Sequence, residues 1–224
     1  MAIILSIETS TTNCSVSIAE KGQLKALVEE NNVNYSHSEN LHRFIKEALK
    51  DASFSLNDLD AIAVSKGPGS YTGLRIGVSA AKGLCFSLDK PLISVSTLEA
   101  LSHQVEATSG FIAPLLDARR MEVYSAVFDF DHQEIRETRA EIIDEHSFSD
   151  FLDQDKVYFV GPGAEKCKSI LLHSNARFSE NIAMPSAKEM TRLAYEKFKI
   201  SNFEDVAYFE PYYLKDFISG GKKK

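Results

Sequence analysis

The residues best suited to chemistry lie in a polar stretch near the start of the chain. Glu8, Thr9, Ser10, Thr11 and Thr12 follow an apolar run at residues 3–7 and precede an alternating stretch at residues 14–18. This order predicts a β-hairpin whose turn carries hydroxyls and backbone N–H groups that could cradle a phosphate. A plain polar turn between two strands is the alternative.

A second candidate anion site lies at residues 66–75, where Gly67, Gly69 and Ser70 precede a predicted helix. Glycines let the backbone approach an anion, and the helix N-terminus favours negative charge. The segment is not a P-loop, because Leu74 stands where the lysine would be, and Gly73 falls one residue late for a dinucleotide fingerprint. A purely structural turn explains these residues as well.

Metal and nucleophile motifs are weak in this sequence. His37, Glu39 and His42 do not form the H-E-x-x-H motif, and histidines five residues apart point to different faces of a helix. We find no G-x-S-x-G elbow. The sequence therefore predicts no metal site and no catalytic residue.

The elements that would position these residues are predicted to occur twice. Residues 3–18 read as a hairpin, followed by a strand at 23–30, a helix, a strand at 61–64, Gly67-Pro68-Gly69 and a helix at 70–88. The same order returns as a hairpin at 111–128, a strand at 135–143, a short helix at 147–152, a strand at 157–160, Gly161-Pro162-Gly163 and a helix through Leu172. Such an ordered repeat predicts a duplicated α/β unit, with residues 1–105 and 106–224 as the two lobes.

Tandem units of this kind resemble the actin-like ATPase and sugar-kinase superfamily. The predicted fold is therefore α/β, with two lobes of that type. The second copy is shorter in its middle, so we expect its lobe to be truncated. The resemblance fixes no activity.

The second predicted helix of the first lobe carries more apolar residues than one buried stripe needs. The helix at 70–88 is apolar almost all round, so it is either interior to the chain or covered by another protein. If another protein covers this helix, the candidate contact residues on it are Leu74, Gly77, Val78 and Ala81.

Composition narrows the function classes. The net charge of −7 argues against a dedicated nucleic-acid binder, which usually has a basic face. Three scattered cysteines favour reduced thiols in the cytoplasm, no signal peptide is predicted, and no apolar run is long enough to span a membrane.

At residues 4–10 and 66–83 the chain resembles the TsaB family, also called YeaZ, which takes part in making N6-threonylcarbamoyladenosine at position 37 of tRNA. Residues 116–124 and 211–215 resemble further elements of that family. The resemblance implies a non-catalytic dimerisation and activating subunit of a threonylcarbamoyltransferase complex. It implies TsaD, the catalytic paralogue, and the small ATPase TsaE as partners, a homodimer when TsaD is missing, and only indirect contact with tRNA. It also implies an interface built from the first two helices, which adds Leu41, Phe44 and Ile45 of the first helix to the candidate contact residues.

The resemblance also explains why no catalysis is expected. Catalytic relatives carry an H-x-x-x-H motif where this chain has Thr97 and Leu101, and neither side chain replaces a metal-binding imidazole. We therefore expect no metal and at most weak nucleotide binding. Two alternatives remain: an autonomous nucleotide-dependent ATPase or kinase that uses the turn at Glu8, and a peptidase, for which the sequence lacks a nucleophile arrangement and a metal set.

Overall fold

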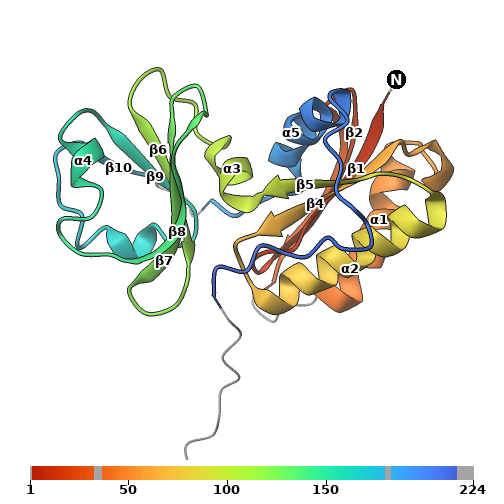
Figure 1. Ribbon diagram of the computed structural model, residues 1–224, viewed down its shortest axis with the longest axis horizontal. Helices are drawn as coiled ribbons and strands as arrows, with labels where there is room; N and C mark the ends of the chain where they lie inside the picture. Colours follow the sequence, from red (N-terminus) through yellow and green to blue (C-terminus); the bar gives the residue numbers. More distant parts are fainter. Residues whose placement is uncertain (1, 33–36, 180–182, 216–224) are drawn as a thin grey trace, which may run out of the picture.

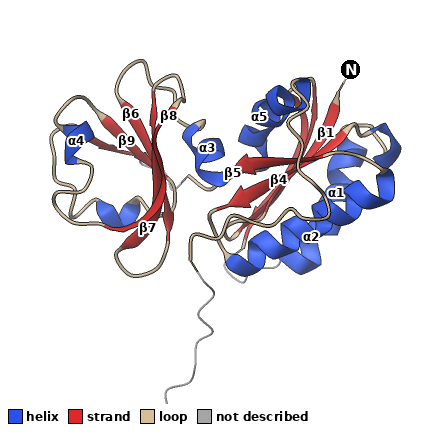
Figure 2. Ribbon diagram, in the orientation of Figure 1, coloured by secondary structure: helices blue, strands red, loops and turns tan. Residues whose placement is uncertain are grey.

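A computed structural model describes residues 2–32, 37–179 and 183–215 and shows two α/β lobes side by side (Figures 1 and 2). The first sheet has the strand order β3-β2-β1-β4-β5. Its strands are β1 (Ile3–Glu8), β2 (Asn13–Glu20), β3 (Gln23–Asn31), β4 (Ala61–Gly67) and β5 (Leu92–Ser96). β1, β2 and β3 pair antiparallel, whereas β4 is parallel to β1 and β5 to β4.

The second sheet repeats this plan with the order β10-β9-β6-β7-β8. Its strands are β6 (Phe111–Asp117), β7 (Glu122–Asp129), β8 (Glu134–Ile142), β9 (Val157–Val160) and β10 (Ala176–Phe178). Strands β6, β7 and β8 pair antiparallel, and β9 and β10 continue the sheet in parallel. The predicted duplication and α/β fold class are confirmed.

The helices on the first sheet are long, and those on the second are short. Helices α1 (His37–Asp51) and α2 (Tyr71–Leu88) cover the first sheet, followed by the bridging helix α3 (Thr97–Ser102). In the described part of the second lobe the helical elements are α4 (Ser149–Leu152) and a 3-10 turn, η2 (Glu165–Cys167). The predicted helix through Leu172 is wrong: beyond Cys167 the described backbone continues with bonds such as Ile170 N–H to Cys167 O, the spacing of a 3-10 turn. The second lobe is therefore truncated, as predicted.

Strand β1 divides its side chains between two cores. Leu5 and Ile7 pack in the core shared with α1 and α2, whereas Ile4 packs on the other face with α5 (Ala187–Lys199). This alternation follows from the two-residue period of a strand. Helix α5 thus covers the first sheet, although the predicted boundary at residue 105 assigns it to the second lobe.

Helix α3 joins the two lobes. Its residues Leu98 and Leu101 are fully buried in one cluster with Ile112 and Val160 of the second sheet. A Cβ at Gly161 would lie only 2.6 Å from the Cδ2 atom of Leu101, so a side chain at this position would push α3 away from the second sheet.

Residues 203–215, which we call the strap, run along α2 and on to the second lobe (Figure 1, dark blue). The Glu204 N–H donates to Leu92 O at 2.8 Å, and the Tyr212 N–H donates to Lys66 O at 2.7 Å. Lys215 forms an ion pair with Glu122 of β7. The strap thus fastens both lobes. Among the described helices, none has the length and apolar character needed to cross a membrane.

Candidate functional site

The hydroxyl-rich turn joins β1 to β2, and Glu8 is the last residue of β1, directly before the turn. The Glu8 side chain is fully buried, and its Oε1 atom accepts hydrogen bonds from the Ser10 N–H at 2.5 Å and the Ser65 hydroxyl at 3.0 Å. Burial raises the pKa of the Glu8 carboxyl, and the hydrogen bonds from Ser10 and Ser65 oppose that rise. The carboxyl is thus an internal group of the first lobe.

The start of α2 packs directly on this turn. The Ser70 N–H donates to Ser10 O at 2.6 Å. A Cβ at Gly69 would lie 2.5 Å from Ser10 O, and one at Gly73 or Gly77 would overlap Thr9. The glycines of the predicted anion segment therefore serve, in this structure, to bring the helix onto the hairpin turn.

The eight candidate anion-binding residues come together where the turn meets α2, but they differ in accessibility. Glu8, Thr9, Ser10 and Gly67 are buried, and Thr11, Thr12, Gly69 and Ser70 are half-buried. Nucleotide binding stays a prediction, and it would depend on the four half-buried residues.

Two of the half-buried hydroxyls, one in the turn and one at the start of α2, already have hydrogen-bond partners. The Thr12 hydroxyl donates to Asn31 Oδ1 at 2.7 Å, and the Ser70 hydroxyl accepts from the Gly73 N–H at 3.3 Å as the N-cap of α2. An anion would therefore compete with existing hydrogen bonds for these groups.

The two positions where the family resemblance implies metal-binding histidines in catalytic members lie on α3. Thr97 and Leu101 are one helical turn apart, and both are fully buried. Within the described ranges, no group of three or more His, Cys, Asp or Glu residues is placed to hold a metal ion. Leu101 instead contributes to the core between the lobes.

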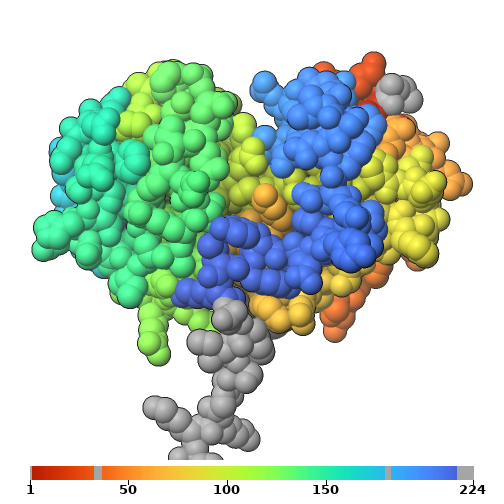
Figure 3. Space-filling view, viewed as in Figure 1, coloured from red at the N-terminus to blue at the C-terminus, as the bar shows by residue number. Residues whose placement is uncertain are grey.

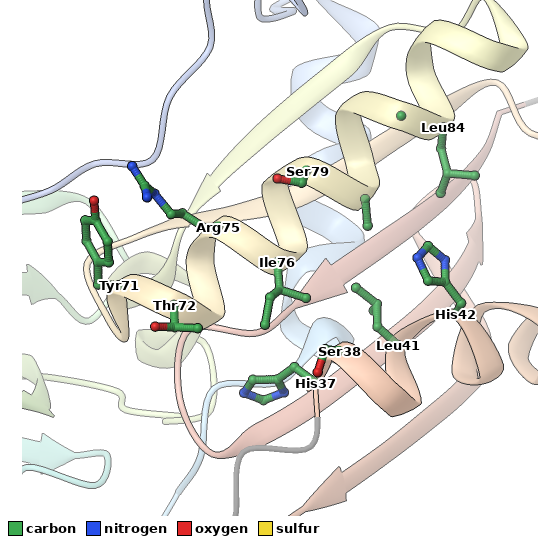
Figure 4. Close-up of a pocket in the computed structure, with 12 residues that line it drawn as sticks. His37, Ser38, Leu41, His42, Tyr71, Thr72, Arg75, Ile76, Ser79 and Leu84 are labelled. Carbon is green, nitrogen blue, oxygen red and sulfur yellow. The ribbon is translucent and has the colours of Figure 1, made fainter.

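A groove of about 820 Å³ opens between α1 and α2 (Figure 4). Helix α1 supplies Leu41 and His42 to it, and α2 supplies Ile76, Ala80 and Leu84. The remaining lining residues are His37, Ser38, Tyr71, Thr72, Arg75, Ser79 and Gly83. A Cβ at Gly83 would meet no atom within 4 Å, so this wall of the groove is open.

The seven predicted interface residues lie on the inward faces of α1 and α2, and of these seven Leu41 alone also lines the groove. All of them are buried in the first lobe, with exposed fractions of 1% for Leu41 and 4% for Val78. The accessible apolar stripe is formed instead by Ile76, Ala80 and Leu84, which are half-buried. Their i, i+4, i+8 spacing in the sequence was the signal for this second stripe.

The N-terminal end of the groove carries a small aromatic and cationic cluster. The Arg75 guanidinium lies 4.4 Å from the centre of the Tyr71 ring and donates from Nε to the Tyr213 hydroxyl at 3.3 Å. The Tyr71 and Tyr213 rings are 4.8 Å apart. The strap therefore contributes to the groove's surroundings through Tyr213.

Comparisons with known proteins agree with this architecture. The family described as TsaD, tRNA N6-adenosine threonylcarbamoyltransferase, matches residues 31–217. The tRNA threonylcarbamoyladenosine biosynthesis protein TsaB of Escherichia coli is 30% identical over 98% of this chain and 97% of its own. The TsaB protein of Haemophilus influenzae is 32% identical over 98% and 96% of the two chains.

Two solved structures from Pseudomonas aeruginosa share the fold. One, described as similar to peptidase YEAZ, has a TM-score of 0.84 and covers 96% of this chain and 100% of its own. The other, YeaZ, has a TM-score of 0.77 with the same coverage, and each is 24% identical to this chain. The fold follows from these structures and the family from the sequence matches: the chain belongs to the TsaB family of tRNA threonylcarbamoyladenosine biosynthesis proteins.

Proposed function

We propose that this chain is a non-catalytic dimerisation and activating subunit of the tRNA N6-adenosine(37) threonylcarbamoyltransferase complex, in which it supports a TsaD protein. The family places the chain in tRNA threonylcarbamoyladenosine biosynthesis. The subunit role is the finer part of the proposal, and the groove between α1 and α2 carries it.

The groove has the character of a helix-docking surface. Ile76 and Leu84 of α2 lie across the groove from Leu41 of α1 (Figure 4). Ala80 also lines the groove and is four residues from each of Ile76 and Leu84, so the three form one row along α2. Two small groove-lining residues, Ala80 in this row and Gly83 beside it, would let a partner helix approach closely. Apolar area of this kind is buried most effectively by another protein.

The environment of the other candidate site supports a non-catalytic role. The carboxyl of Glu8 is buried under the turn, and Thr97 and Leu101 offer no imidazole to a metal ion. Transfer chemistry is therefore assigned to TsaD. The same proposal includes TsaE as a further partner and a homodimer of this chain in the absence of TsaD. It also includes a cytoplasmic location and the lack of a resident cofactor.

The test is complex formation with the cognate TsaD, measured as molar mass by light scattering. Gly83→Glu adds a charge where the chain has open space, so we expect it to leave folding intact and to weaken the complex about 100-fold or more, because the carboxylate would be buried without a partner. Asn57→Glu, on the exposed 3-10 turn η1 (Leu56–Asp58), is the matched control and should bind as the unaltered chain does. Undisturbed binding by Gly83→Glu would place the contact elsewhere.

The alternative of an autonomous ATPase or kinase has its own assay. ATP turnover by the purified chain that is lost in Glu8→Gln would favour it over the subunit role. We expect no turnover, because the Glu8 carboxyl has no access to solvent.

A further inference from the structure

The turn between β6 and β7 has an unusual backbone for its sequence. Arg119 and Arg120 are consecutive and have φ angles of +74° and +51°. Left-handed backbone costs a residue with a side chain about 1 kcal/mol or more, and glycine or asparagine adopts it at lower cost. This turn therefore keeps two arginines where smaller residues would be more stable.

Both guanidinium groups are exposed and unpaired. Across the described part of the chain, neither the Arg119 nor the Arg120 side chain has a hydrogen bond or an ion pair, whereas Arg136 and Arg139 both pair with Glu141. The two arginines thus present positive charge to solvent on a chain that is acidic as a whole.

The base of the turn is rigidly held. The ammonium of Lys166 donates to Asp117 Oδ1 at 2.5 Å and to the carbonyl oxygens of Arg120 and Glu122 at 2.8 and 2.6 Å. The Arg119 N–H also donates to Asp117 Oδ1, at 2.8 Å. The local acids are therefore occupied by lysines and backbone, and the tip is preorganised.

The tip lies on the side of the molecule where the strap and the start of α2 meet. Lys215 of the strap pairs with Glu122 at the base of the turn, and Tyr213, two residues earlier, contacts Tyr71 and Arg75 of α2. In Figure 3 the turn projects from the lower edge of the second lobe, next to the end of the strap. It therefore flanks the end of the proposed partner surface without lining the groove.

We infer that the tip formed by Arg119 and Arg120 is a phosphate-contacting element that touches the tRNA backbone when the chain is part of its complex, a direct contact where the family resemblance implies only an indirect one. Guanidinium groups bind phosphate oxygens with paired hydrogen bonds, and two adjacent groups on a projecting turn can reach neighbouring phosphates. The inference rests on the proposed function, because the chain's net charge of −7 leaves it dependent on a partner for the rest of the RNA contact.

The experiment uses the assembled complex with TsaD and measures tRNA affinity over a series of salt concentrations. Arg119→Asn/Arg120→Asn removes both charges and introduces asparagines, which tolerate a left-handed backbone, so the conformation of the turn should be retained. We expect tRNA affinity at low salt to fall about 10-fold or more. The slope of log affinity against log salt should become shallower by the amount that corresponds to the loss of about two phosphate contacts. Arg177→Gln/Lys156→Gln removes the same charge from exposed positions at β10 and next to β9 and should change neither quantity.

The outcomes separate this inference from the proposed function. Light scattering first establishes whether the unaltered chain and TsaD assemble, and failure there concerns the proposed function alone. Unchanged affinity and slope in an intact Arg119→Asn/Arg120→Asn complex would overturn the RNA contact. Loss of assembly in that variant would also overturn it, in favour of an acidic protein surface as the tip's partner.

Discussion

The hydroxyl of Thr9 donates a 2.8 Å hydrogen bond to the carbonyl oxygen of Gly73, across the contact between the first hairpin turn and the first turn of α2. A carbonyl in the first turn of a helix normally accepts from an N–H four residues on. Here the turn's hydroxyl adds a second bond to it. The turn and the helix thus form one packed unit, and the Thr9 hydroxyl stabilises the contact between them.

Gly77→Ala tests this contact, because a Cβ at Gly77 would overlap the Thr9 hydroxyl oxygen. We expect the free energy of unfolding to fall by about 1–3 kcal/mol as a result of overpacking. Gly83→Ala, on the same helix but facing open space, is the control and should raise stability by up to about 1 kcal/mol through helix propensity. Urea unfolding followed by circular dichroism measures both, and equal effects of the two substitutions would contradict the packing described.

Glu8→Gln should change how stability depends on pH. Because burial raises the pKa of Glu8 in the folded chain above its ordinary value of 4.5, the folded state binds more protons than the unfolded state between those two pKa values. The free energy of unfolding of the unaltered chain should therefore decrease as pH rises through that window. Glutamine cannot ionise and can still accept from the Ser10 N–H, so the variant should lose this decrease.

Urea unfolding at a series of pH values from 4.5 upward checks this, and the stability of Glu8→Gln relative to the unaltered chain should grow with pH. Glu106→Gln, at an exposed position in the loop after α3, is the matched control. A difference between Glu8→Gln and the unaltered chain that shrinks with rising pH would mean that the folded carboxyl is stabilised as a carboxylate.

The three cysteines should be inert in the native chain. All are buried, and burial raises the pKa of Cys14 and Cys85 to about 12 and that of Cys167 to about 11. Since the thiolate is the nucleophile, we expect a chromogenic disulfide reagent at pH 8 to react no faster than the chain unfolds. The same reagent in concentrated urea should titrate all three thiols, and a fast native reaction would contradict their burial.

The repeat was readable from the sequence because each of its parts has a strong local signal. Residues 14–18 alternate and β2 follows from that alternation, while Gly67-Pro68-Gly69 and Gly161-Pro162-Gly163 mark the ends of β4 and β9. The packing of α5 on the first sheet was not readable, because chain order suggests the second lobe. Its placement depends on long-range bonds, such as Ser17 Oγ to Ala187 O at 2.8 Å.

The candidate sites show the same limit at the level of single side chains. Apolar periodicity identified α1 and α2 but could not tell which face meets the sheet, so Leu41 and Val78 were selected although their side chains belong to the core. Substituting either by aspartate would unfold the first lobe and would not report on a partner. The spacing of Ile76, Ala80 and Leu84 is visible in the sequence, but only the position of the sheet shows that this stripe faces outward.

The placement of α5 has a consequence for how the chain reaches its native state. One face of the first sheet stays uncovered until residues 187–199 arrive, after the whole second sheet has been made. During synthesis on the ribosome, Ile4, Ile93 and their neighbours in the first lobe would therefore stay exposed to solvent until α5 is synthesised. A gene fragment that stops after α3 should consequently yield an aggregation-prone product, while splitting the chain within the second lobe and supplying both pieces offers a route to reassembly.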